Sequence, residues 1–128
     1  MEKPSLRMIT IFPNSYYTIR PGIEVPRIVV EEIDHAPELE EIKKQLEFKS
    51  GQLIETIPYF TTLLSEPCIA FCDEEGKLKG LHYNAIATAL WDLACRKDGV
   101  LEPGRPLRDY LVGAVIIIAG DKELLRNL

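Results

Sequence analysis

The sequence predicts an α+β fold: a single domain, residues 1–128, with a mixed β-sheet of about five strands and two main helices packed on one side of it. Three observations predict this class. Short β-branched and aromatic runs recur between Pro, Gly and Asn turn residues. Two longer segments instead carry apolar residues at spacings of three and four. No repeat, low-complexity tract or linker divides a chain that has the length of one ordinary domain.

Two strands are predicted near the N-terminus. Met8–Phe12 is a β-branched and aromatic run that ends in a Pro-Asn-Ser turn. Arg27–Ile33 follows Pro26, which suits a strand start because proline cannot donate a hydrogen bond to a central ladder. Apolar residues fall on both faces of the second strand, so we expect it to be mostly covered.

The first predicted helix runs from Asp34 to Phe48. Asp34 suits the N-cap, because its carboxylate can accept hydrogen bonds from the amides of the first turn. Leu39, Ile42 and Leu46 then form one apolar stripe. Acidic residues precede lysines, as the helix dipole favours, and we expect the charged face to be solvated.

The middle of the chain predicts a strand and a hairpin. Leu53–Ile57 alternates without indicating which face is buried. Cys68–Cys72 places its two cysteines and Ala70 on one face of a second strand. Asp73–Gly76 has the composition of a tight turn, so we expect Lys77–Leu81 to return as the other strand of a hairpin.

Asn84 is a strong N-cap for the second predicted helix, Ala85–Lys97. Asp92 and Arg96 are spaced for an ion pair on its outer face. The main buried stripe is expected to comprise Ile86, Leu90, Leu93 and Ala94, with Ala87 and Trp91 beside it.

The C-terminal part predicts a loop, a strand and a short helix. Residues 98–109 are punctuated by Gly and Pro and form the loop. Leu111–Gly120 is short and β-branched, as is typical of a central strand buried on both faces. Asp121 can cap a last short helix.

Composition favours a cytoplasmic protein with neither a nucleic-acid nor a membrane partner. The net charge is -5, from 20 acidic and 15 basic residues, which argues against a groove lined by Lys and Arg. No uncharged apolar run approaches the roughly 18 residues that span a bilayer, and the N-terminus lacks the features of a signal peptide. The three cysteines lack the spacing of a disulfide framework.

The candidate ligand site lies at the start of the second helix. His82 and Tyr83 precede the Asn84 cap, where helix amides and the helix dipole favour an anion such as a phosphate or carboxylate. Arg105 and Arg108 lead toward the central strand and are expected to reach the same end of the sheet. The plain alternative is that His82 ends a hairpin, Asn84 only caps, and the arginines are solvated.

We expect no metal, no cofactor and no catalytic residue. Cys68, Cys72, His82 and Cys95 lack the tight knuckle and second ligand pair of a structural zinc site. A cysteine nucleophile needs a base, and only Cys72 lies near His82. No phosphate loop, dinucleotide fingerprint or nucleophile elbow occurs. The enzymatic alternative is His82 as an acid or base with Cys72 or Asp73.

The chain resembles the domain of unknown function family 3846, found in phage, plasmid and bacterial proteins. The resemblance covers residues 36–120 approximately. Its pattern is an acidic-Gly turn, a Gly-Lys-Leu-x-Gly-Leu segment, an Asn, a helix, Asp-x-Ile/Leu-x-Gly and a β-branched strand. The matching positions are Asp73–Gly76, Gly76–Leu81, Asn84, Ala85–Cys95, Asp109, Gly113 and Val115–Ile118.

The chain departs from the family at two places. The family often has Pro where His82 or Tyr83 stands, and the loop from Lys97 to Arg108 is longer here. The family has no assigned activity to carry over. The resemblance implies an accessory protein, often of mobile-element origin, that binds a host component or a small signal.

The sequence therefore predicts a small non-enzymatic accessory protein that binds a host protein or a small anionic ligand. A small enzyme and a structural subunit of a homo-oligomer are the alternatives. An exposed sheet edge or a large apolar patch would favour the oligomer.

Overall fold

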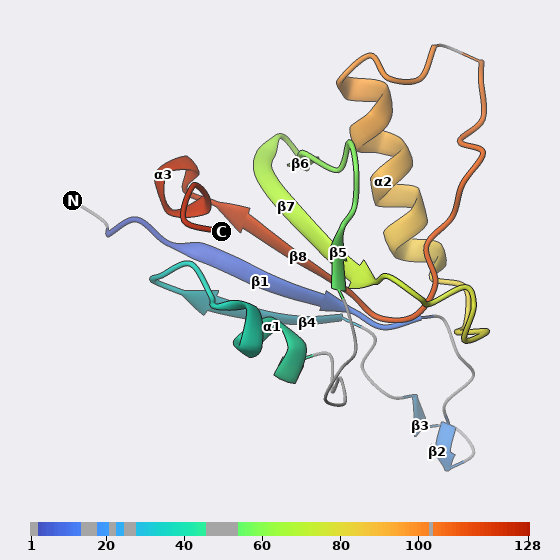
Figure 1. The fold of residues 1–128 in the computed structure, drawn as a ribbon, viewed down its shortest axis with the longest axis horizontal. Coiled ribbons are helices and arrows are strands. Elements are labelled where there is room, and N and C mark those ends of the chain that lie inside the picture. Colours follow the sequence, from blue (N-terminus) through green and yellow to red (C-terminus); the bar gives the residue numbers. More distant parts are fainter. Residues whose placement is uncertain (1–2, 14–17, 21–22, 25–27, 46–53, 103) are drawn as a thin grey trace.

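The structure is a computed structural model that describes residues 3–13, 18–20, 23–24, 28–45, 54–102 and 104–128 (Figure 1). In chain order the elements are β1 (Leu6–Ile11), β2 (Thr18–Arg20), β3 (Ile23–Glu24), β4 (Ile28–Ile33), α1 (Leu39–Gln45), β5 (Ile54–Thr56), β6 (Thr62–Leu63), β7 (Glu66–Asp73), α2 (Ala85–Lys97), β8 (Val115–Gly120) and α3 (Lys122–Leu125). Five strands of the main sheet have the order β4-β1-β8-β7-β5, and β6 pairs with β7. The predicted α+β class is confirmed.

The strand pairs among the described residues are all antiparallel, whereas a mixed sheet was expected. A strand–helix–strand connection such as β7–α2–β8 ordinarily serves a parallel pair. Here the chain runs back along α2 after the helix ends, because Arg105 is hydrogen-bonded to Arg96 and Leu111 to Thr88. β8 therefore starts at the end of the sheet where β7 finishes.

The central strand β8 is buried on both faces, as its sequence predicted, but it begins at Val115 rather than at Leu111. Val115, Ile117 and Ala119 belong to the core cluster that packs against α2. Ile116 and Ile118 belong to a second cluster that includes residues of α1 and α3. Both faces of the sheet are thus covered, and the expectation of helices on one side only was wrong.

Strand β4 was expected to be mostly covered and is instead exposed along most of its length. Ile28, Val29 and Val30 keep 45%, 39% and 59% of their surface accessible. These side chains are exposed because β4 is an edge strand, at one end of the strand order. Residues 25–27, which include the proline expected to start the strand, lie outside the described residues.

Helix α1 begins five residues later than predicted, at Leu39, so Asp34 is not its N-cap. Pro37 disfavours helical geometry in Ala36, the residue before it, so the helix does not extend back to Asp34. Ile42 is buried as expected, but Leu39 is half exposed. The rest of the predicted helix and stripe, residues 46–48, lies outside the described residues.

The predicted hairpin after β7 does not form, because Lys77–Gly80 forms turns and Leu81 is not in a strand. The Asp73 carboxylate accepts a hydrogen bond from the Glu75 amide at 2.8 Å and from the Lys79 ammonium at 2.7 Å. Such local side-chain bonds compete with the bonds of a strand ladder. The chain then makes one isolated bridge, between Tyr83 and Val112, before α2 begins.

Helix α2 has the predicted N-cap, since the Asn84 side chain accepts from the Ala87 amide. The buried side of the helix differs from the predicted stripe. Leu93 is 57% exposed, whereas Trp91 and Cys95 are buried. The Trp91 indole donates to the carbonyl of Pro58 at 2.8 Å, which turns this side of the helix toward the sheet.

Two predicted polar contacts near the helices are confirmed. The Asp92–Arg96 ion pair forms at 2.9 Å. Asp121 caps α3 by accepting from the Leu124 amide at 3.0 Å. Of the helices in the described part of the chain, none is long and apolar enough to cross a membrane.

Candidate functional site

Asn84 is fully buried, and its side chain is occupied by the fold. The side-chain carbonyl oxygen of Asn84 accepts a hydrogen bond from the Ala87 amide at 3.1 Å. Its amide group donates to the carbonyls of Ile11 and Gly113, at 2.9 Å each. The residue therefore fastens the start of α2 to the end of β1 and to the segment before β8. We call these contacts of Asn84 with Ala87, Ile11 and Gly113 the Asn84 clasp.

His82 and Tyr83 lie outside the clasp, on the surface. The His82 carbonyl accepts from the Gly113 amide at 2.7 Å, and the Asn84 amide donates to the Leu111 carbonyl at 2.8 Å. These backbone bonds hold the short stretch 82–84 beside 111–113. The half-exposed Tyr83 ring meets the Tyr110 ring edge-on, with centroids 6.0 Å apart.

The structure does not place Arg105 beside the Asn84 clasp. The Arg105 carbonyl accepts from the Arg96 guanidinium at 2.8 Å, and its side chain pairs with Glu102. Arg96 lies twelve residues after Asn84, which corresponds to about 18 Å along a helix.

Arg105 and Arg108 line an open cavity of about 560 Å³ whose wall contains none of His82, Tyr83 and Asn84. The consecutive residues His82, Tyr83 and Asn84 thus lie beside residues 111–113, and the two arginines share the lining of this cavity. Anion binding by these five residues stays a prediction.

The cysteines are buried and protonated. Burial raises the pKa of the Cys68 and Cys72 thiols to about 12, and it also raises the pKa of Cys95. A thiol in this state is a poor nucleophile at neutral pH, because the thiolate is the reactive form. Within the described part of the chain, no three His, Cys, Asp or Glu side chains are grouped to hold a metal ion.

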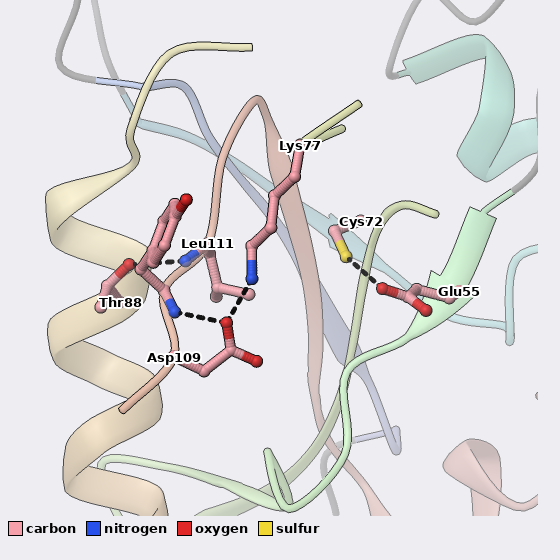
Figure 2. Close-up of polar contacts among 7 residues, drawn as sticks. Glu55, Cys72, Lys77, Thr88, Asp109 and Leu111 are labelled. Carbon is pink, nitrogen blue, oxygen red and sulfur yellow. Dashed lines mark hydrogen bonds and ion pairs between the residues drawn. The ribbon is translucent and has the colours of Figure 1, made fainter. Parts of the chain in front are cut away.

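A cleft of about 300 Å³ lies where β5 and β7 approach the segment 109–112 (Figure 2). The buried side chains of Ile57, Trp91, Leu111 and Val112 form its apolar lining. Its polar lining comes from Glu55, Cys72, Asp73, Glu74, Lys77, Asp109 and Tyr110. These residues come from the two strands β5 and β7, from the turn that follows β7 and from the loop before β8.

The β7 side of this cleft carries two carboxylates with different partners. The Cys72 thiol donates to the Glu55 carboxylate at 3.6 Å, as Figure 2 shows. Asp73 is 7% exposed and is paired with Lys79, which itself lies outside the cleft. Burial makes the Asp73 pair a fixed part of the wall, whereas the exposed Glu55 carboxylate remains accessible to a ligand.

At the other side of the cleft, Lys77, Asp109 and Tyr110 form what we call the Lys77 corner. The Lys77 ammonium forms an ion pair with the Asp109 carboxylate and lies 4.4 Å from the centre of the Tyr110 ring. The Tyr110 amide also donates to Asp109 at 2.8 Å. The hydrogen bond from Lys77 lowers the pKa of the Asp109 carboxyl, so Asp109 is ionised at neutral pH.

The residues of the Lys77 corner were missed as a site in the sequence. Lys77 was assigned to a returning strand, and its partner Asp109 lies 32 positions along the chain. The signal was that Lys77 and Asp109 both belong to the pattern of the family resemblance, which assigns neither of them a role. Spacing alone does not bring a turn and a distant loop together.

Comparisons of the chain with models of known families, with curated proteins and with solved structures found no match. The resemblance to the domain of unknown function family 3846 therefore stays a prediction.

Proposed function

We propose that this protein is a non-enzymatic binding module that takes up a positively charged group in the cleft beside the Lys77 corner. The observation that carries the proposal is the position of the Lys77 ammonium. It sits between the Asp109 carboxylate and the Tyr110 ring, which is the arrangement that proteins use to bind ammonium and guanidinium ligands. The position of the Lys77 ammonium indicates where the cationic group of a ligand binds.

The charge of the cleft supports a cation rather than the anion that the sequence predicted. Four carboxylates line it, from Glu55, Asp73, Glu74 and Asp109, against the single ammonium of Lys77. Lys79 neutralises Asp73 from outside the cleft, and Lys77 neutralises Asp109. The two remaining carboxylates attract a cation and repel a phosphate.

The dimensions of the cleft favour one side chain or a small amine. About 300 Å³ is at the lower end of the range for ligand pockets. Leu78 is 88% exposed and Tyr110 is half exposed, so apolar surface borders the charged groups. A lysine or arginine side chain of a partner protein combines a cationic head with an apolar stem, which matches this lining.

The chemistry of the cleft supports binding over nucleophilic catalysis. Cys72 is the nucleophile-type side chain in the lining, and burial, followed by the neighbouring Glu55 charge, raises its pKa to about 12. An activated cysteine needs the opposite shift, produced by a nearby cation or helix N-terminus.

The test uses Trp91, the single tryptophan of the chain, which lines the cleft and reports on its occupancy by fluorescence. The protein is titrated with Nα-acetyl-lysine methylamide and with the uncharged Nε-acetylated form of the same compound. We expect binding of the charged compound, weakened at least about tenfold in Asp109→Asn, because the carboxylate contributes a charge-assisted bond.

Glu123→Gln is the matched control, because it removes one carboxylate from the exposed surface of α3. Its affinity should equal that of the wild type. Equal binding of the charged and acetylated compounds, or no effect of Asp109→Asn, would contradict the proposal.

A further inference from the structure

Strand β4 presents an uninterrupted edge. It pairs with β1 through six consecutive residues, from the Leu6–Ile33 pair to the Ile11–Ile28 pair, without a bulge. Of the strands that the structure describes, β1 is its only partner. The backbone groups on the outer side of β4 are therefore available to a further strand.

The side chains of β4 make this edge unusual. Ile28, Val29 and Val30 are three consecutive β-branched residues, and Val30 is 59% exposed. Monomeric proteins usually protect an edge strand with charged side chains, proline or a bulge. Ile28–Ile33 contains neither proline nor a bulge, and its charges are confined to Glu31 and Glu32. The opposing residues of β1, such as Thr10 and Ile11, are almost completely buried.

We infer that a second copy of this chain pairs with β4, antiparallel and about a two-fold axis at Val30, which extends the sheet across both copies. Two residues that face each other across an antiparallel pair point to the same side of the sheet, and side chains alternate sides along a strand. The numbers of two facing residues in such a dimer must therefore add to an even sum. Val30 then faces the partner's Val30, Val29 faces the partner's Glu31, and Ile28 faces the partner's Glu32.

Charge and strand length together select this register. Axes at Ile28 and Val29 pair at most three residues of β4 with the partner, whereas an axis at Val30 pairs the five residues from Ile28 to Glu32. An axis at Glu31 or at Glu32 places two carboxylates directly opposite each other, which is destabilising. A parallel pairing in register has the same defect. With the axis at Val30, each carboxylate faces an aliphatic side chain, and the most exposed apolar residue of the strand is buried at the centre of the contact.

The register is tested by placing lysine at two neighbouring exposed valines and measuring dimer dissociation by sedimentation. In Val30→Lys the two ammonium groups face each other, and we expect the dissociation constant to rise at least about tenfold. In Val29→Lys each ammonium faces the partner's Glu31, and we expect the dissociation constant to stay equal or fall. Val100→Lys, an exposed valine in the loop after α2, should match the wild type.

All three variants change exposed side chains, and circular dichroism checks that each remains folded. A wild-type protein that sediments as a monomer at every concentration would overturn the inference. So would equal weakening by Val29→Lys and Val30→Lys, which would indicate apolar association without this register.

Discussion

The Asn84 clasp and the Lys77 corner flank the same short segment, residues 109–113, yet their polar groups have opposite environments. The clasp is completely buried, and both polar groups of the Asn84 side chain have backbone partners. The corner is about half exposed and holds an ammonium against a carboxylate and a ring. A saturated buried group has no capacity left for a ligand, whereas an exposed ion pair can exchange partners.

Within residues 109–113, the residues that stabilise the fold lie next to the residues of the proposed binding site. Gly113 and Leu111 position the segment through backbone bonds to His82 and Asn84. Asp109 and Tyr110, immediately before them, present their side chains to the cleft. Substitutions in the clasp should therefore change stability, and substitutions in the corner should change binding.

The largest expected effect is the loss of stability in Asn84→Ala. A simple N-cap contributes about 1 kcal/mol, but this change also leaves the buried carbonyls of Ile11 and Gly113 without a donor. Each unsatisfied buried group costs further free energy, so we expect about 3 kcal/mol in total. Urea unfolding measures it.

Asp121→Ala is the control for this prediction, because Asp121 caps α3 through one bond to the Leu124 amide. It should cost about 1 kcal/mol. Equal losses in the two variants would mean that the Asn84 clasp contributes no more than an ordinary cap.

The next largest effect is expected for Gly113→Ala. Gly113 has a φ of 70°, and a Cβ atom there would lie 2.7 Å from the Leu81 side chain. Left-handed geometry and crowding together should cost about 2 kcal/mol in the free energy of unfolding. Gly104→Ala isolates the first contribution, because Gly104 has a φ of 82° and no atom within 4 Å of the added Cβ. If Gly104→Ala were as costly as Gly113→Ala, contact with Leu81 would not matter.

Much of the fold was predictable because its signals are local. The Asn84 and Asp121 caps, the turn at Asp73 and the doubly buried run Val115–Gly120 each depend on a few adjacent residues. The exposure of β4 was not predictable, because a strand's place in the sheet is decided by long-range pairing. The same β-branched pattern is compatible with a buried central strand and with an exposed edge strand.

The candidate site was harder to predict than the fold. Chain proximity grouped His82 and Tyr83 with Asn84, but it gave no sign that the Asn84 side chain binds the carbonyl of Ile11, 73 positions away. Lys77 lies in a turn and not in the predicted returning strand, and its ammonium therefore reaches Asp109. The Lys77 corner joins one turn to one distant loop, so only the tertiary structure reveals it.

The smallest effect on stability, and the most direct test of the proposed function, is expected for Lys77→Met. The Lys77–Asp109 pair is exposed, so its loss should change the free energy of unfolding by less than about 0.5 kcal/mol. Removal of the chain's own cation should leave Asp109 and Tyr110 open to a ligand. The affinity for Nα-acetyl-lysine methylamide, measured by Trp91 fluorescence, should then rise at least about threefold.

Lys122→Met, which removes an exposed lysine from α3, has the same change in net charge and should bind as the wild type does. We expect tighter binding of the charged compound in Lys77→Met alone, with no gain for its acetylated form. Unchanged or weaker binding of the charged compound in Lys77→Met would contradict it.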